Sequence, residues 1–269
     1  MSQRREVEAR LTLFGELSGI LGAMRSFALT ELRRIGKREN AQQLVMQSLS
    51  AALTDLSGLE TTSRHDSTPV ANEIWILFGS ARGFCGSFNE DVMRFWQNRN
   101  AAAQGSLILL GERLHDQATE NPGRLCIAGA DSCLNTADTI DRILAAVTEL
   151  RGGEDRPFNL YACCHDEQGA RIQQLWPLPI VQASSNRQPP LTHEPIAEVA
   201  AQIANHYLYH SLLAMLLRSI KTENHMRLMQ METALRHLER GTEEMLRQRN
   251  RFRQEEIVEE IELMIVNRH

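Results

Sequence analysis

The sequence predicts an α/β protein organised by two long helices, which form an antiparallel coiled coil with an α/β domain inserted between them. From about residue 194 to the end the chain reads as one helix, with no proline after Pro195. A second helical pattern covers 4–56, and short apolar runs alternate with amphipathic segments between the two. The expected domains are an N-terminal helix at 1–57, an α/β domain at 71–182 and a C-terminal helix at 194–269.

The composition limits the class of protein. A chain of 269 residues with 42% hydrophobic and 23% charged content fits one full core plus an extension. The net charge of −5 argues against a general nucleic-acid binder. The five cysteines show no CxxC spacing, which favours a reducing compartment. No apolar run approaches the ~20 residues that cross a bilayer, and the first ten residues lack the apolar core of a secretory signal, so any work at a membrane is expected to need a partner.

The N-terminal helix is expected over Arg4 to Leu56. Its apolar residues first keep heptad spacing and then slip by one position. Before the slip the stripe holds Phe14, Leu17, Leu21, Met24 and Ala28, and after it Leu32 and Ile35. Gly15, Gly19, Gly22 and Gly36 each weaken a helix by about 1 kcal/mol relative to alanine. They indicate either the close approach of another helix or a locally weak helix, and the sequence leaves both open.

A linker rich in serine, threonine and glycine is expected at 57–69, followed by the α/β pattern. Apolar runs predict strands at 74–78, 107–110, 125–128 and 158–163, with an edge strand at 171–178. Amphipathic spacing predicts helices at 88–97 and 136–150. Alternation of this kind builds a Rossmann-like domain with a mainly parallel sheet.

The C-terminal helix has a longer apolar stripe than the N-terminal one. At spacings of three and four it holds Leu228, Met231, Leu235, Leu238, Met245 and Phe252, with Thr242 and Arg249 in the two positions between. At ~1.5 Å per residue, some 70 helical residues span roughly 105 Å. A helix of that length cannot bury itself inside its own domain, so we expect it to lie against partners.

The loop at 79–89 is the strongest local signal in the α/β domain. Its glycines lie at the carboxyl end of a strand and before a helix, where nucleotide folds bind phosphate. However, no Lys-Ser/Thr pair and no GxGxxG follows, and no histidine and acid accompany Cys85 as they would a nucleophile. A structural or docking turn is therefore predicted, formed by Arg82, Gly83, Cys85, Gly86 and Asn89.

No catalytic, cofactor or metal site is expected elsewhere. His206 and His210 lie one helical turn apart, as zinc ligands can, but the usual further ligand is missing, and an exposed polar face explains them better. The alternating arginines between Arg247 and Arg253 make the end of the long helix basic around much of its circumference. Such an end is either simply solvated or turns inside a collar of partner loops.

Three segments then resemble a known family. Residues 223–231, 250–257 and 259–261 are similar to the C-terminal helix of the gamma subunit of F-type ATP synthases. The loop at 80–89 resembles that family's glycine-cysteine turn, and Gly22-Ala23-Met24 resembles an Ala-Met step of its N-terminal helix. The order of long helix, α/β insert and longer helix agrees over nearly the whole chain.

The sequence also departs from the family pattern. Ala81 stands where the family usually has an acid, and the N-terminal helix has lost most of the family's lysines, as at Gly22. These differences suggest an atypical branch, such as the alternate (N-type) ATPases of bacteria and archaea.

The resemblance implies a central rotor stalk that performs no bond chemistry itself. It would transmit torque between the ion-carrying c-ring and a catalytic hexamer of alpha and beta subunits, coupling ion transport to ATP synthesis or hydrolysis. The α/β domain would contact the c-ring and the epsilon subunit, at the cytoplasmic face of the cell membrane. Matching positions place Arg227 and Gln254 against the beta-subunit catch loops, with Arg253 and Glu260 as further candidates and Met24 opposite the beta lever.

Two other functions fit the residues without the resemblance. One is a structural coiled-coil adaptor whose α/β domain binds a small ligand. The other is an enzyme that uses Cys85. Neither explains the C-terminal motif.

Overall fold

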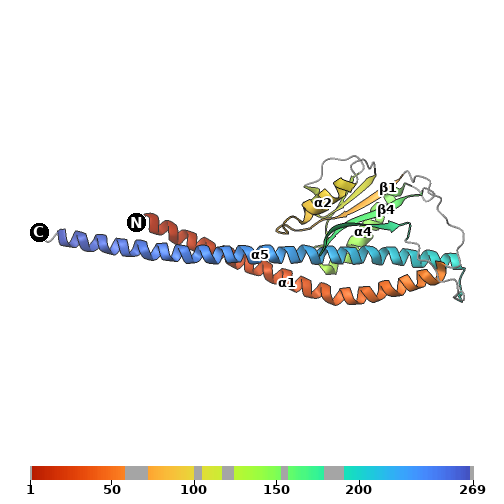
Figure 1. Cartoon of the computed structure of the whole chain (residues 1–269), viewed down its shortest axis with the longest axis horizontal. Helices are drawn as coiled ribbons and strands as arrows, with labels where there is room; N and C mark the ends of the chain where they lie inside the picture. The colour runs from red at the N-terminus through yellow and green to blue at the C-terminus, as the bar shows by residue number, and fades with distance from the viewer. Residues whose placement is uncertain are drawn as a thin grey trace. The chain divides into compact units, whose positions relative to one another are not determined.

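The computed structural model describes residues 2–57, 72–99, 105–116, 124–152, 157–178 and 191–266. It contains both predicted long helices, α1 (Ser2–Ser57) and α5 (Ile196–Val266), with the strands between them in the chain (Figure 1). The chain divides into two compact units. The helical unit is Met1–Thr30 with Arg227–His269, and the α/β unit is Glu31–Met226. The predicted linker and the domain limits at 71 and 182 lie outside the described residues, apart from Ser57.

In the helical unit α1 and α5 are antiparallel. Arg4 Nη1 lies 2.8 Å from Glu256 Oε2, and Arg25 Nε lies 3.5 Å from Glu232 Oε1. Residue numbers therefore rise along one helix while they fall along the other, which confirms the predicted antiparallel pair.

The apolar stripes predicted from spacing are largely covered in the folded chain. On α5 every stripe position from Leu228 to Phe252 is buried or half-buried, including Thr242 and Arg249. On α1 the stripe is also covered, except that Leu17 lies at its margin with 39% of its surface exposed. Coiled-coil spacing thus predicted the buried face of both helices.

The glycines of the two helices differ in their surroundings. A Cβ at Gly241 would lie 2.7 Å from Phe14 Cε2, so the absence of a side chain there lets α1 and α5 approach. At Gly15, Gly19, Gly22 and Gly36 an added Cβ meets no described atom within 4 Å. Within the described chain, these four positions favour the interpretation of a locally weak helix.

The described strands of the α/β unit form one sheet. Its strands are β1 (Glu73–Phe78), β2 (Ser106–Leu110), β3 (Arg124–Ile127), β4 (Asn159–Asp166) and β5 (Gly169–Trp176). Their spatial order is β3-β2-β1-β4-β5. The first four strands in this order run parallel to one another, and β5 is antiparallel to its neighbour β4. The mainly parallel sheet and its edge strand are as predicted.

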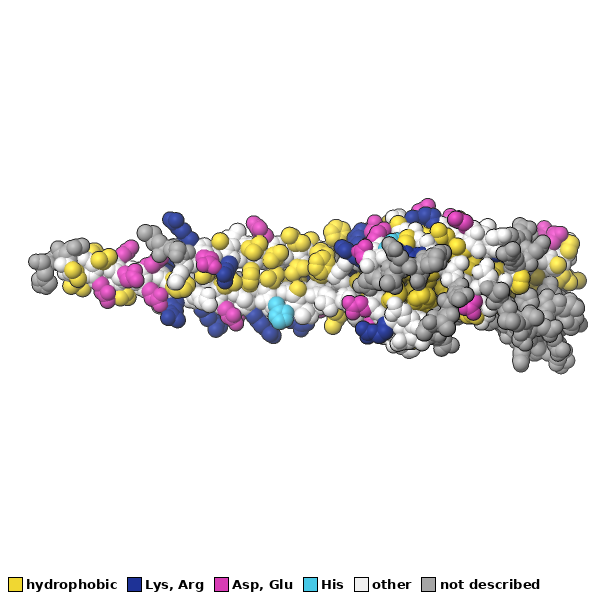
Figure 2. Space-filling model, turned by 90° about the horizontal axis from the view of Figure 1, so that it is seen from above, with side chains coloured by type: hydrophobic (Ala, Val, Ile, Leu, Met, Phe, Trp, Pro, Cys, Tyr) yellow, Lys and Arg dark blue, Asp and Glu magenta, His cyan; other side chains and the backbone are white. Residues whose placement is uncertain are grey.

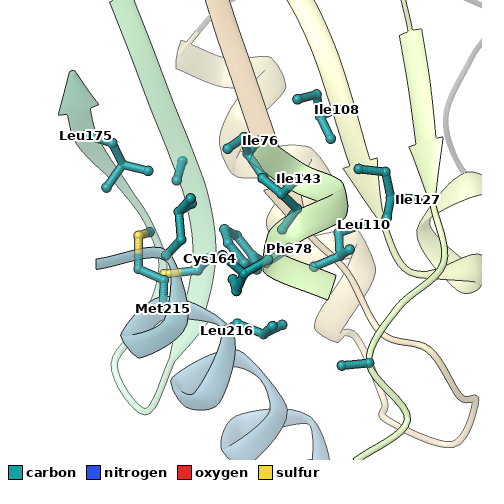
Figure 3. Close-up of a cluster of buried hydrophobic side chains, with 14 of the residues drawn as sticks. Ile76, Phe78, Ile108, Leu110, Ile127, Ile143, Cys164, Leu175, Met215 and Leu216 are labelled. Atoms are coloured by element: carbon teal, nitrogen blue, oxygen red, sulfur yellow. The ribbon is translucent and has the colours of Figure 1, made fainter. Parts of the chain in front are cut away.

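The two faces of this sheet bury alternate residues. Ile76 and Phe78 point into a core shared with α4 (Thr136–Arg151) and the first half of α5 (Figure 3). Trp75 and Leu77 point to the opposite face, against α2 (Phe88–Arg99). On the first face Ile35 of α1 joins the core, so the N-terminal helix is part of the domain's packing. Two short elements were not predicted, α3 (Glu112–His115) and the 3-10 turn η1 (Cys133–Asn135).

Candidate functional site

The predicted docking turn links β1 to α2 and closes on itself through buried polar groups. The Ser80 amide donates to Asn89 Oδ1 at 2.9 Å, and Asn89 Nδ2 donates to Ser80 Oγ at 2.8 Å. The Cys85 thiol also donates to Ser80 Oγ, at 3.3 Å. Asn89, Ser80 and Cys85 are all buried, so these bonds fix the shape of the loop from inside.

A different set of residues faces outward from the turn. Arg82 is exposed and its Nε lies 3.2 Å from Asp131 Oδ1, while Gly83 packs beside Arg113. Phe84 has 64% of its surface exposed and a φ of 61°, followed by Gly86, also at 61°. Of the predicted docking residues, Arg82 and Gly86 are therefore exposed, whereas Cys85 and Asn89 are internal supports.

Phe84 is the exposed residue that sequence reasoning missed. An exposed apolar side chain at positive φ, two residues before a glycine that also has positive φ, is unusual for a turn with no partner. The available signal was an aromatic residue between Gly83 and Gly86 that no strand or helix pattern accounts for.

Among the described residues, no group of three or more histidine, cysteine, aspartate or glutamate side chains is placed to hold a metal ion. His210 is half-buried and its Nδ1 lies 3.2 Å from Gln42 Oε1, while Gln42 Nε2 donates to the His210 carbonyl at 2.7 Å. Burial, and secondarily the charge of His206, lower the pKa of His210. His210 therefore belongs to the contact between α1 and α5. An exposed polar face was predicted for both histidines, and only His206 is exposed.

The predicted rotor-contact residues differ in exposure. Arg253, Gln254 and Glu260 are exposed on α5, and Met24 is half-buried on α1. Arg227 has only 6% of its surface exposed and interacts within the chain, which leaves it least available for an outside partner. Contact between any of these residues and a hexamer stays a prediction.

The end of α5 has apolar surface that the chain itself does not cover. Every residue of 257–266 is exposed. The large hydrophobic side chains there are Ile257, Val258, Ile261, Leu263, Met264, Ile265 and Val266. The predicted stripe ended at Phe252, so sequence reasoning did not single out this surface.

A second uncovered apolar surface lies on α1 in the helical unit. Leu13, Ile20 and Phe27 are 51%, 58% and 71% exposed, at the spacing of seven that keeps residues on one helix face. Figure 2 shows such hydrophobic side chains among the charged ones on the helices. These side chains share one helix face, which is the arrangement that a partner helix or groove would cover.

Two further features bear on function. Within the part of the chain that the structure describes, no helix has the length and apolar character needed to span a membrane. In the α/β unit, a groove of about 440 Å³ lies among residues of α1, α5 and β5 and is lined by polar side chains such as Asn40, Gln43 and Gln173. None of the turn residues lines this groove.

Comparisons with known proteins give one consistent result. The family model described as ATP synthase matches residues 3–265. An ATP synthase gamma chain of Azobacteroides pseudotrichonymphae is 21% identical, over 97% of this chain and 96% of the relative. One of Staphylococcus epidermidis is 24% identical, but the match covers only 42% of each chain. The chain thus aligns with less than half the length of that relative.

Solved structures show the same fold. A rotor chain of the Euglena gracilis mitochondrial ATP synthase matches with a TM-score of 0.62 at 14% identity, over 95% of this chain and 99% of that one. A chain of the Tetrahymena thermophila mitochondrial ATP synthase, from its central stalk and c-ring, matches with a TM-score of 0.53 at 14% identity, over 80% and 99%.

Proposed function

Because this chain belongs to the ATP synthase family as a gamma chain, the non-catalytic central rotor stalk of the F-type enzyme, we propose that its helical unit turns inside a hexamer of alpha and beta subunits. The α/β unit would be attached to the c-ring and the epsilon subunit. Torque would pass between these two ends, coupling ion transport to ATP synthesis or hydrolysis.

The uncovered end of α5 is the observation that supports this proposal most strongly. Leu263, Met264, Ile265 and Val266 are consecutive and exposed, and at about 100° per residue they point to all sides of the helix. A flat partner or a single groove would cover only one side. A collar of surrounding subunits would cover every side, as a shaft in a hexamer requires.

The rotor mechanism needs contacts that change with angle rather than reactive groups. Exposed side chains on α5, namely Arg253, Gln254 and Glu260, would meet a different beta subunit at each position, and Met24 would face the beta lever. Each contact would favour one state of the nucleotide site over another, and the differences would carry the torque. Strong ion pairs between the arginines of 247–253 and the hexamer would hold the shaft at particular rotation angles. Only weak ion pairs are therefore expected there.

The location and the branch follow as part of the proposal. Membrane attachment would be peripheral, at the cytoplasmic face and through the c-ring. The departures at Ala81 and Gly22 would place the chain in the N-type branch, which the genes beside its own would test.

Truncation after Phe252 tests the importance of the tip. The shortened chain would lose the apolar end of α5, so assembly or ion-coupled ATP turnover of the complex should fall more than with any single substitution. The intact chain with Arg247→Ala is the matched control and should behave as wild type. Full assembly and full coupled turnover by the truncated chain would contradict the proposal.

Copurification separates this function from the alternatives. A tagged chain that acts as the stalk recovers alpha and beta subunits in fixed proportion. The adaptor, with a ligand in the polar groove of the α/β unit, would not recover them. An enzyme based on Cys85 would show thiol-dependent turnover in the isolated chain, which the burial of that thiol disfavours.

A further inference from the structure

We propose that Glu31 and Arg38 form a register lock, which fixes α1 against the α/β unit so that torque on the helix passes to the domain without slipping. The lock deepens the proposed rotor function and rests on it. It consists of two oppositely charged side chains of α1 that bind the same residue, Cys133, in the 3-10 turn η1 that leads into α4.

The acidic half of the lock is a buried carboxylate. Glu31 is 9% exposed, and its Oε1 accepts hydrogen bonds from the Cys133 amide and, at 2.9 Å, from Ser132 Oγ. Burial acts to raise the pKa of Glu31, but the hydrogen bonds from these two residues and the charge of Arg34 together outweigh it, and the pKa lies below its ordinary value. The turn is thus the main factor that holds the carboxylate in its charged form, with a smaller contribution from Arg34.

The basic half binds the other end of the same residue. Arg38 Nη1 donates to the Cys133 carbonyl, which also accepts from Thr136 Oγ1, so α1 bonds to both the backbone donor and the backbone acceptor of one residue. The two side chains lie seven residues apart, about 10 Å along the helix. Between them Ile35 is fully buried in the core under the sheet.

These bonds do something that the apolar contact cannot. Apolar packing is non-directional, so Ile35 would tolerate small movements of α1 over the core. Two bonds of opposite polarity to one residue can form together in only one register. A shift by one helical turn, about 5.4 Å, would break both and leave a buried charge without its partners.

The other polar contacts of α1 in this unit differ in kind. Glu39 pairs with Lys221 of α5 at 3.1 Å, and like Arg38 neither side chain is buried. Gln42 bonds to His210, also on α5. These contacts hold the two long helices together, whereas the lock ties α1 to the short turn that leads into α4.

The test uses the assembled complex and compares ion pumping with ATP hydrolysis. Glu31→Ala and Arg38→Ala should leave hydrolysis close to wild type, while ions pumped per ATP fall by about threefold or more. Glu31→Gln should restore most of the ratio, since its amide oxygen can still accept from the turn. Arg34→Ala is the matched control, because Arg34 lies 3.6 Å from Glu31 on the exposed side of α1 and does not bind the turn.

Three results would overturn the lock. The first is an unchanged pumping ratio in Glu31→Ala complexes with full subunit content. The second is an equal fall with Arg34→Ala. If Glu31→Ala does not assemble, Ser132→Ala is used instead, since it removes one of the two donors to Glu31 and should lower the number of ions pumped per ATP by less. The third contradicting result is an unchanged number of ions pumped per ATP in Ser132→Ala complexes. Failure of the wild-type chain to copurify with alpha and beta subunits would instead contradict the rotor function itself.

Discussion

The two units of this chain cover their apolar residues in different ways. The α/β unit encloses its own core, in which Ile76 and Phe78 have no exposed surface. The helical unit buries one stripe and leaves Phe27 and the apolar end of α5 exposed. The α/β unit therefore has a core of its own, although Phe84 is exposed on its surface, while the helical unit leaves apolar residues outside its stripe uncovered. That difference fits the proposed rotor, in which other subunits would cover the helical unit.

The largest expected effect comes from the core of the α/β unit. Phe78→Ala should lower the free energy of unfolding by about 3–5 kcal/mol, because it removes a buried ring and leaves a cavity. Denaturant unfolding of the isolated chain measures this. Phe27→Ala, in the helical unit, should cost almost nothing in the same experiment. Equal losses of unfolding free energy in Phe78→Ala and Phe27→Ala would contradict the contrast between the two units.

Alkaline pH should also weaken the α/β unit. Burial raises the pKa of Cys163 from 9.0 to about 12, with a smaller contribution from Cys164. The unfolded thiol ionises above pH 9 and the folded one does not, so stability is complete below pH 9. Between pH 9 and 12 it should fall by up to about 1.4 kcal/mol per pH unit. Burial also raises the pKa of Cys164 and of Cys133, so the slope measured in Cys163→Ala should be smaller than in the wild type without vanishing. An unchanged slope would assign it to these other groups.

A glycine pair sharpens the comparison inside the helical unit. Gly19→Ala should stabilise the isolated chain by about 1 kcal/mol, since alanine is the better helix former and space is open there. Gly241→Ala should gain less or destabilise, because its Cβ would meet Phe14. Thermal unfolding of both variants gives the answer. A loss at Gly19 in the complex, with a gain in the free chain, would show that a partner approaches that face.

The smallest effect is expected at the basic end of α5. Arg247 is exposed, so Arg247→Ala should change stability by no more than about 0.5 kcal/mol. Coupled ATP turnover by the complex should also stay at the wild-type level. A clear loss of turnover would mean that Arg247 makes a strong contact with the hexamer at particular rotation angles.

Regular patterns made most of the fold predictable. Heptad spacing identified the buried faces of both helices, and apolar runs identified all five strands, since these signals repeat over many residues. The elements α3 and η1 are too short to have a period. The predicted docking turn was a continuous motif, although its buried and exposed members could not be told apart without coordinates.

The lock and the exposed surfaces were beyond the sequence for a different reason. Glu31 and Arg38 look like ordinary charged positions of a long helix, and only the fold brings Cys133 to them. Phe84 and the residues after Phe252 show their exposure only once the neighbouring elements are in place. The contacts predicted for Met24, Arg227 and Gln254 depend on subunits outside this chain.

Rotation of the labelled chain tests the central claim most directly. Cys126 is exposed and the other four cysteines are buried, so a probe can be attached to the α/β unit at one position. With the complex immobilised through its hexamer and supplied with ATP, the probe should turn in one direction and pause once for each catalytic beta subunit. Steady ATP hydrolysis by intact complexes with a stationary probe would contradict the account.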